Sequence, residues 1–219
     1  MAEVLAVVAA GPGLGRAVAL RFAREGFAVG LIARSPERLS GLVAELTAGG
    51  ATAVAVAGAD VGEEDQLRAA IRELTGELGP VTVLVFNGSA YVEGSGLSIS
   101  AADLRNALDV GVLAAMVAVQ EVAPPMRGVG RGTVILTGSI AADRASTGAT
   151  AVGVAKAGLR NLALSLHKEL AAEGVRVTTV TIDGVLSGPE ALDVGAIADR
   201  YWALHAAPEP PGAVEVFPG

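Results

Sequence analysis

Short apolar runs alternate along the chain with longer segments in which apolar positions recur at helical spacing. The runs, which read as buried strands, are residues 4–9, 28–33, 51–57, 81–86, 133–137, 175–182 and 213–217. The helical segments are residues 14–25, 36–48, 63–78, 101 to about 123, and 150–173. Strands that alternate with helices predict an α/β fold, a doubly wound parallel sheet of about seven strands with helices on both faces. No linker or charge block divides the pattern, so residues 1–219 are expected to form a single domain.

The helical segment that begins at residue 101 is apolar on more than one face. Leu104, Leu108 and Val112 continue one stripe, while Val110 and Leu113 belong to another. A helix that is apolar all round is buried on two sides, and one side can cover the sheet. The other side needs a partner, most simply the same helix of a second subunit, which predicts a homodimer or homotetramer. The alternative is a helix buried within the monomer.

The pattern loosens after residue 182 into Gly/Pro-rich segments around a short helix, whose apolar positions are Ile197, Tyr201, Trp202 and Leu204. Ligands of parallel sheets bind outside the carboxyl ends of the strands. Residues 185–212 are therefore predicted to form a lid on the substrate side.

Composition narrows the possible partners. The chain has 219 residues, 52% of them hydrophobic, and a formal net charge of −7, so it offers no basic footprint for nucleic acid or an anionic membrane. With no cysteine, disulfides, thiol catalysis and thiolate metal sites are excluded.

His167 and His205 lack a carboxylate or second histidine at ligand spacing, so no metal site is expected. The first residues lack a positive leader and no apolar run reaches about 18 residues, which predicts a soluble cytoplasmic protein.

Three glycines, Gly11, Gly13 and Gly15, stand where the first strand gives way to a helix that begins at Leu14. Such a turn lets the backbone approach a pyrophosphate, whose charge meets the unpaired N–H groups at the helix N-terminus. The strand that follows the helix completes a βαβ unit of about 30 residues, the context that a dinucleotide-binding turn requires. The alternative is a tight turn that holds no ligand.

Three further motifs follow the glycine turn. Asn87 lies in the run VLVFNGSA, Ser139 in VILTGSIAA and Lys156 in ATAVGVAKAGL. Together with the glycine turn, in which Ala9 replaces a first glycine, these runs resemble the short-chain dehydrogenase/reductase family over essentially the whole chain. The resemblance implies a single-domain Rossmann fold, NAD or NADP as cofactor, and an oxidoreductase site in which Asn, Ser, Tyr and Lys surround the nicotinamide.

The resemblance also implies which residues hold the cofactor. Relatives that select NAD carry an acidic residue where this chain has Ala33 followed by Arg34, and a guanidinium there favours NADP because it suits a 2′-phosphate. Arg38 is interpreted as a solvated helix residue. Asp60 matches the acidic residue that meets the adenine amino group, although it can instead cap the following helix. The cofactor-binding residues implied are Gly11, Gly13, Leu14, Gly15, Arg34, Asp60, Val61, Asn87, Gly88, Lys156 and Ile182.

The catalytic set that the family implies is incomplete. Ser139 and Lys156 match its serine and lysine, but Val152 stands at the tyrosine position and Gly111 at the asparagine position. In the family the tyrosine supplies a proton to the substrate oxygen, which valine cannot do. With Ile-Asp-Gly at 182–184 as well, the chain resembles a divergent branch of the family that keeps the lysine without the tyrosine.

Two functions remain open. One is an NADP-dependent oxidoreductase that acts on a ketone, an imine or an activated alkene, with a proton from Tyr91, Asp183, Tyr201 or a water on Lys156, or with no proton needed. The other is a catalytically inactive sensor or scaffold that binds NADP. A purely structural subunit is a third possibility, and it requires that no cofactor binds.

Overall fold

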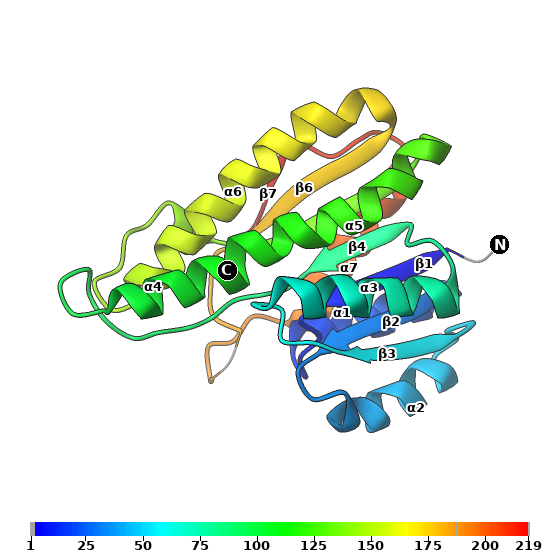
Figure 1. The fold of residues 1–219 in the computed structure, drawn as a ribbon, viewed down its shortest axis with the longest axis horizontal. Helices are drawn as coiled ribbons and strands as arrows, with labels where there is room; N and C mark the ends of the chain where they lie inside the picture. Colours follow the sequence, from blue (N-terminus) through cyan, green and yellow to red (C-terminus); the bar gives the residue numbers. More distant parts are fainter. Residues whose placement is uncertain (1–2, 187, 219) are drawn as a thin grey trace.

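The computed structural model describes residues 3–186 and 188–218, which form one sheet of seven strands with helices on both faces (Figure 1). The strands run parallel in the order β3-β2-β1-β4-β5-β6-β7. Their bounds are β1 (Val4–Val8), β2 (Ala28–Ala33), β3 (Val54–Gly58), β4 (Val83–Phe86), β5 (Gly132–Ser139), β6 (Val175–Ile182) and β7 (Val214–Phe217). The order reverses between β1 and β4, so a crevice opens outside their carboxyl ends. The predicted α/β fold is confirmed.

Helices cover the two faces of the sheet in two layers. In Figure 1, α3, α5 and α6 lie in front of the sheet and α1 and α7 behind it. The helices are α1 (Leu14–Ala23), α2 (Ser40–Ala48), α3 (Glu64–Leu78), α4 (Ala101–Leu108), α5 (Ala114–Val129), α6 (Thr150–Leu170) and α7 (Val194–Ala206). Shorter turns are η1 (Pro36–Leu39), η3 (Ile140–Ala142) and η4 (Ala171–Glu173), and η2 (Asp109–Leu113) is a π-helical segment between α4 and α5.

Successive strand residues point to opposite faces, so each strand contributes to two cores. In β1, Val4, Ala6 and Val8 pack under α3 and α5, while Leu5 and Val7 pack under α1. Burial on both faces explains why the strands read as continuous apolar runs. The layers are close because many of the contacting residues are small.

Several element boundaries differ from the predictions. The third and fourth strands begin at Val54 and Val83, later than predicted, and the long helix continues to Val129 instead of ending near residue 123. Pro124 and Pro125 are exposed, so their rings point away from the core, and burial of Met126 one step later holds the last turns in place. A proline pair therefore misled the prediction of the helix end.

Ala9, at the end of β1, is the one non-glycine residue of the described segments with a positive φ, +60°. An alanine in this left-handed conformation is strained by about 1 kcal/mol relative to glycine. We therefore expect Ala9→Gly to raise the free energy of unfolding by up to about 1 kcal/mol, measured by urea denaturation. Ala10→Gly is the control, because Ala10 is buried with no positive φ, and it should lower stability. If both variants lowered the free energy of unfolding equally, Ala9 would not be strained.

Candidate cofactor and active site

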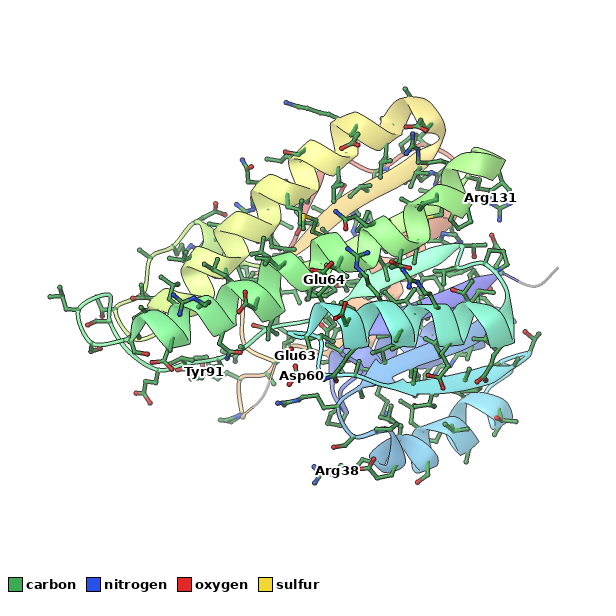
Figure 2. The ribbon with its side chains drawn as sticks, viewed as in Figure 1. Arg38, Asp60, Glu63, Glu64, Tyr91 and Arg131 are labelled. Atoms are coloured by element: carbon green, nitrogen blue, oxygen red, sulfur yellow. The ribbon has the colours of Figure 1, made fainter. Side chains whose placement is uncertain are left out.

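A cavity of about 490 Å³ opens outside the carboxyl ends of the first four strands. It is lined by residues 9–11 after β1, 33–34 at the end of β2, 59–61 after β3, and 87 and 89–91 after β4. Asn106 of α4 and Val110 of η2 close its outer side. Figure 2 shows Asp60 and Tyr91 at this end of the sheet, with Arg131 at the opposite end. Gly11, Arg34, Asp60, Val61 and Asn87, all inferred from the sequence as cofactor-binding residues, thus share one cavity.

The glycine turn leaves the N-terminus of α1 open toward this cavity. No side-chain cap of α1 is found among the described residues, and the first turn of the helix carries no acidic group. A Cβ at Gly11 or Gly13 would have no neighbour within 4 Å, whereas a Cβ at Gly15 would lie 3.2 Å from the Cα of Ala10. Gly15 therefore keeps the helix close to β1, and the N–H groups beside Gly13 can meet an anion. The turn fits a pyrophosphate.

Arg34 lines the cavity directly after β2, and none of the described residues pairs with its guanidinium. Ala33 beside it supplies no carboxylate that would repel a phosphate. Arg38 does not line the cavity, and Figure 2 shows it beside α2, away from Asp60. A free cation at the end of the second strand fits a 2′-phosphate.

Asp60 shapes the turn after β3. Its Oδ1 accepts a hydrogen bond from the backbone N–H of Gly62 at 3.0 Å, and its own N–H donates to Oε1 of Gln66 at 3.0 Å. The N-cap of α3 is Glu63, so the alternative of Asp60 as the helix cap is wrong. Its second carboxylate oxygen has no hydrogen bond to a described residue and can accept one from a ligand in the cavity.

Lys156 stands at the inner end of the site and is 5% exposed. Its Nζ donates to the backbone oxygens of Thr137 at 2.8 Å and Gly88 at 3.2 Å. Burial lowers the pKa of the lysine to about 8. The ammonium group therefore joins α6 to the segments at the ends of β4 and β5.

The pKa of Lys156 makes stability depend on pH. In the unfolded chain the lysine holds its proton up to pH 10.5, whereas in the folded chain it loses it near pH 8. Between these values the unfolded state binds more protons, so the free energy of unfolding should rise with pH, by about 3 kcal/mol in total. Denaturant unfolding from pH 7.5 to 10.5 should show this rise in the wild type, whereas Lys156→Met should lack it. If the free energy of unfolding changed with pH in the same way in both proteins, the lowered pKa would not belong to Lys156.

The tyrosine and asparagine positions of the family lie beside this lysine. Val152 is half-buried one helical turn before Lys156 on the same face of α6. Gly111 is buried at the centre of η2, where a Cβ would lie 3.2 Å from the Cβ of Ala155. The close approach of η2 to α6 leaves little room for a larger residue at position 111.

Ser139 ends β5 and pairs in register with Ile182 of β6. Its Oγ accepts a hydrogen bond from the N–H of Ala141 at 3.2 Å, which leaves the hydroxyl proton free to donate. An ion pair crosses the same edge of the sheet, because a guanidinium nitrogen of Arg144 lies 2.9 Å from Oδ1 of Asp183. Ser139, Ile182 and Lys156 do not line the 490 Å³ cavity, although the sequence predicts them to be part of the same site.

The structure separates the predicted proton donors. Tyr201 is fully buried in α7, its hydroxyl lies 2.9 Å from Oγ1 of Thr137, and burial raises the pKa of the phenol far above its ordinary value. It cannot reach a substrate. Asp183 is engaged by Arg144, and Tyr91 is 70% exposed at the rim of the cavity.

The two histidines lie outside the site. Nδ1 of His205 lies 3.0 Å from Oγ1 of Thr133 and burial lowers the pKa of the ring to about 4, while Nδ1 of His167 lies 2.8 Å from the backbone oxygen of Val177. The described residues contain no cluster of three metal-ligating side chains. By length and hydropathy the helix 101–129 is apolar enough to cross a membrane. Half of its apolar 18-residue stretch is buried in the fold, however, as in the core helix of a globular protein.

Sequence reasoning missed Asn106 and Val110 as lining residues. They belong to no motif, because α4 and η2 reach the cavity through their packing against α6. Asn106 stands among other polar residues of α4, such as Asp103 and Arg105, so the sequence pattern does not single it out.

Known proteins are similar to this chain in sequence and in fold. The family model of the short chain dehydrogenases matches residues 3–190. A dehydrogenase subunit from Thauera aromatica, BbsC of (2S)-[(R)-hydroxy(phenyl)methyl]succinyl-CoA dehydrogenase, is 35% identical over 184 residues, 84% of this chain and 72% of that protein. The 3-oxoacyl-[acyl-carrier-protein] reductase FabG of Staphylococcus aureus is 27% identical over 188 residues, 85% of this chain and 76% of the relative.

Solved structures agree with these relatives. A short-chain dehydrogenase from Rhodopseudomonas palustris superimposes with a TM-score of 0.88 at 29% identity, over 99% of this chain and 98% of the other. A metagenomic short-chain oxidoreductase in complex with NADP superimposes with a TM-score of 0.89 at 25% identity, over 99% of this chain and 97% of the other. With the family match over residues 3–190 and the glycine turn, Ser139 and Lys156 in place, this chain belongs to the short-chain dehydrogenase/reductase family, whose members are NAD(P)-binding oxidoreductases.

Proposed function

We propose that the protein is an NADP-dependent oxidoreductase with a degenerate active site. The observation that carries this proposal is Arg34, an unpaired guanidinium at the end of β2 that lines the same cavity as the glycine turn, with Ala33 where NAD-selective relatives have a carboxylate. The similar metagenomic enzyme was solved with NADP, which supports the same choice. NAD is the less favoured cofactor.

The residues present fit NADP along its length. The N–H groups between Gly11 and Gly15 would hold the pyrophosphate, Arg34 the 2′-phosphate, and Asp60 with Val61 the adenine. Asn87 and Gly88 would border the adenosine half, and Lys156 and Ile182 the nicotinamide half. Bound in its reduced form, NADPH supplies a hydride ion.

The chain's own groups limit the substrates. Ser139 can donate its hydroxyl proton in a hydrogen bond to a carbonyl oxygen, but Val152 has no proton to transfer. A substrate that needs no acid at position 152, such as an imine that is already protonated or an activated alkene, suits this site better than a simple ketone. The substrate class is therefore a ketone, imine or activated alkene, with the last two preferred.

Single-turnover oxidation of bound NADPH tests this proposal. Enzyme in excess is mixed with NADPH and then with a ketone, a cyclic iminium ion or an α,β-unsaturated carbonyl compound, and absorbance at 340 nm is followed. Oxidation with at least one class, lost in Ser139→Ala, is expected. Complete inertness of a protein that binds NADPH would contradict an oxidoreductase.

That contradicting outcome would favour the second candidate, a catalytically inactive subunit that senses NADP or supports a partner. Two observations favour it: Val152 replaces the acid, and Lys156 already donates to two backbone oxygens. The similar BbsC protein is itself named as one subunit of a dehydrogenase.

We also propose a homodimer or homotetramer in the cytoplasm. The exposed apolar side chains on η2, α5 and α6 include those that a second subunit would cover, namely Leu113, Met116, Val154 and Leu164. Sedimentation velocity would distinguish this assembly from a monomer.

The proposed substrate-side lid, residues 185–212, includes one residue, Ser187, outside the described segments. Within it, α7 buries Ile197, Tyr201 and Leu204 against the core behind the sheet. Any lid motion would therefore involve the part of the segment that precedes α7.

A further inference from the structure

The outer wall of the 490 Å³ cavity is built by a helix that no cofactor motif includes. Asn106 and Val110 are four residues apart, so they lie on one face where α4 passes into η2, and both line the cavity. Val110 lies close to the turn after β3. A Cβ added at Gly62 would be 3.4 Å from Cγ2 of Val110. Asn106 lies one helical turn before Val110 and lines the same cavity as Asp60 and Val61.

The carboxamide of Asn106 has no structural task among the described residues. It forms no hydrogen bond with any of them, and the helix start is already capped by the reciprocal pair of Ser100 and Asp103. Asn106 is exposed, so its carboxamide is free to bind a ligand, and helix propensity gives no reason for an asparagine in place of alanine.

The polar side chains around Asn106 are also unpaired. Asn87, Ser89 and Tyr91 line the same cavity and form no side-chain hydrogen bond within the part of the chain that the structure describes. Four uncharged polar side chains thus face one space whose only lining cation is Arg34 and whose only lining carboxylate is Asp60. Such a wall suits a neutral ligand surface that both donates and accepts hydrogen bonds.

Adenine presents such a surface. Its amino group donates and the adjacent ring nitrogens accept, and an asparagine carboxamide can match both at once. We infer that Asn106 is a specificity-determining residue that reads the hydrogen-bonding edge of the adenine base, in the cavity that Asp60 also lines. This inference rests on the proposed NADP-binding function, and it adds a base-reading group from α4 to the residues of the strand ends.

The test compares NADPH with its hypoxanthine analogue, in which a carbonyl oxygen replaces the amino group. Isothermal titration calorimetry gives the ratio of the two dissociation constants for the wild type, Asn106→Ala and Arg105→Ala. Arg105 is the matched control, because it is the exposed neighbour on α4 that does not line the cavity. Asn106→Ala should fold, since alanine favours the helix, and circular dichroism confirms this before titration.

The wild type should prefer NADPH by about tenfold or more, since a mismatched hydrogen-bonding edge leaves polar groups unpaired. Asn106→Ala should lose part of this preference, because Asp60 still faces the amino group, and Arg105→Ala should keep all of it. If Asn106→Ala binds NADPH and keeps the wild-type ratio of the two dissociation constants, the inference is overturned while the proposed function stands. If the wild type binds neither nucleotide, the proposed function fails, and the inference fails with it.

Discussion

Replacing Arg34 with alanine is expected to weaken NADPH binding by about 10- to 100-fold, because a charged hydrogen bond to a phosphate contributes roughly 1.5–3 kcal/mol. The affinity for NADH should change little, since NADH has no 2′-phosphate. The ratio of the two dissociation constants therefore moves toward NADH. Fluorescence titration of the reduced nucleotides measures both constants in the same buffer.

Arg38→Ala is the matched control for this prediction. Arg38 carries the same charge four residues later but lies outside the cavity. It should leave the NADPH/NADH ratio unchanged, apart from a small general effect of charge that added salt screens. An Arg34→Ala variant with an unaltered ratio would refute the assignment of Arg34 to the 2′-phosphate.

Restoring a phenol at position 152 should have the largest effect on the reaction. Val152→Tyr would place a hydroxyl group one helical turn from Lys156, on the same face of α6. A nearby ammonium group lowers the pKa of a phenol, and a positioned acid contributes about 10²- to 10⁴-fold to a proton-transfer step. We expect single-turnover oxidation of NADPH by a simple ketone to accelerate by a factor in this range.

Val152→Phe separates the acid from the ring that carries it. The phenylalanine has nearly the same size and shape without the hydroxyl group, so it should stay at the wild-type rate. If the two variants react equally with the ketone, loss of the phenol is not what limits this site. If Val152→Tyr folds, binds NADPH and stays inert, other losses such as Gly111 dominate.

The fold was predictable because its signal is repeated in every strand. A strand that is buried on both faces must be apolar at every position, so it appears in the sequence as a continuous apolar run. In β1, Leu5 and Val7 are buried under α1, and Val4 and Val8 are buried under α3 and α5. Helix ends were less predictable. The prolines at 124 and 125 are normally stop signals, and only tertiary packing of Met126 carries the helix past them.

The site was predictable where a motif fixes a backbone position. The glycine turn, Arg34, Asp60 and Asn87 all lie at strand ends, and parallel strands bring those ends together. Asn106 was missed because it reaches the cavity through the path of α4, which depends on the fit of Gly111 against Ala155 and not on any local pattern. The left-handed backbone at Ala9 was also invisible, since alanine rarely marks such a turn.

Family membership and chemistry are separate conclusions for this protein. The motifs that would hold a dinucleotide are concentrated in the glycine turn and the strand ends, while the family's tyrosine and asparagine positions lie on α6 and η2. Lys156 remains buried and bonded even without its tyrosine, because the oxygens of Thr137 and Gly88 hold it. Such a site can keep the lysine in place after its usual acid is lost.

The central claim is that this chain binds NADPH in preference to NADH, and calorimetric titration of the wild-type protein with each nucleotide tests it most directly. The account predicts saturable binding of both, with NADPH the tighter ligand by about tenfold or more. No heat of binding for NADPH at millimolar concentration, or a tighter complex with NADH, would contradict it.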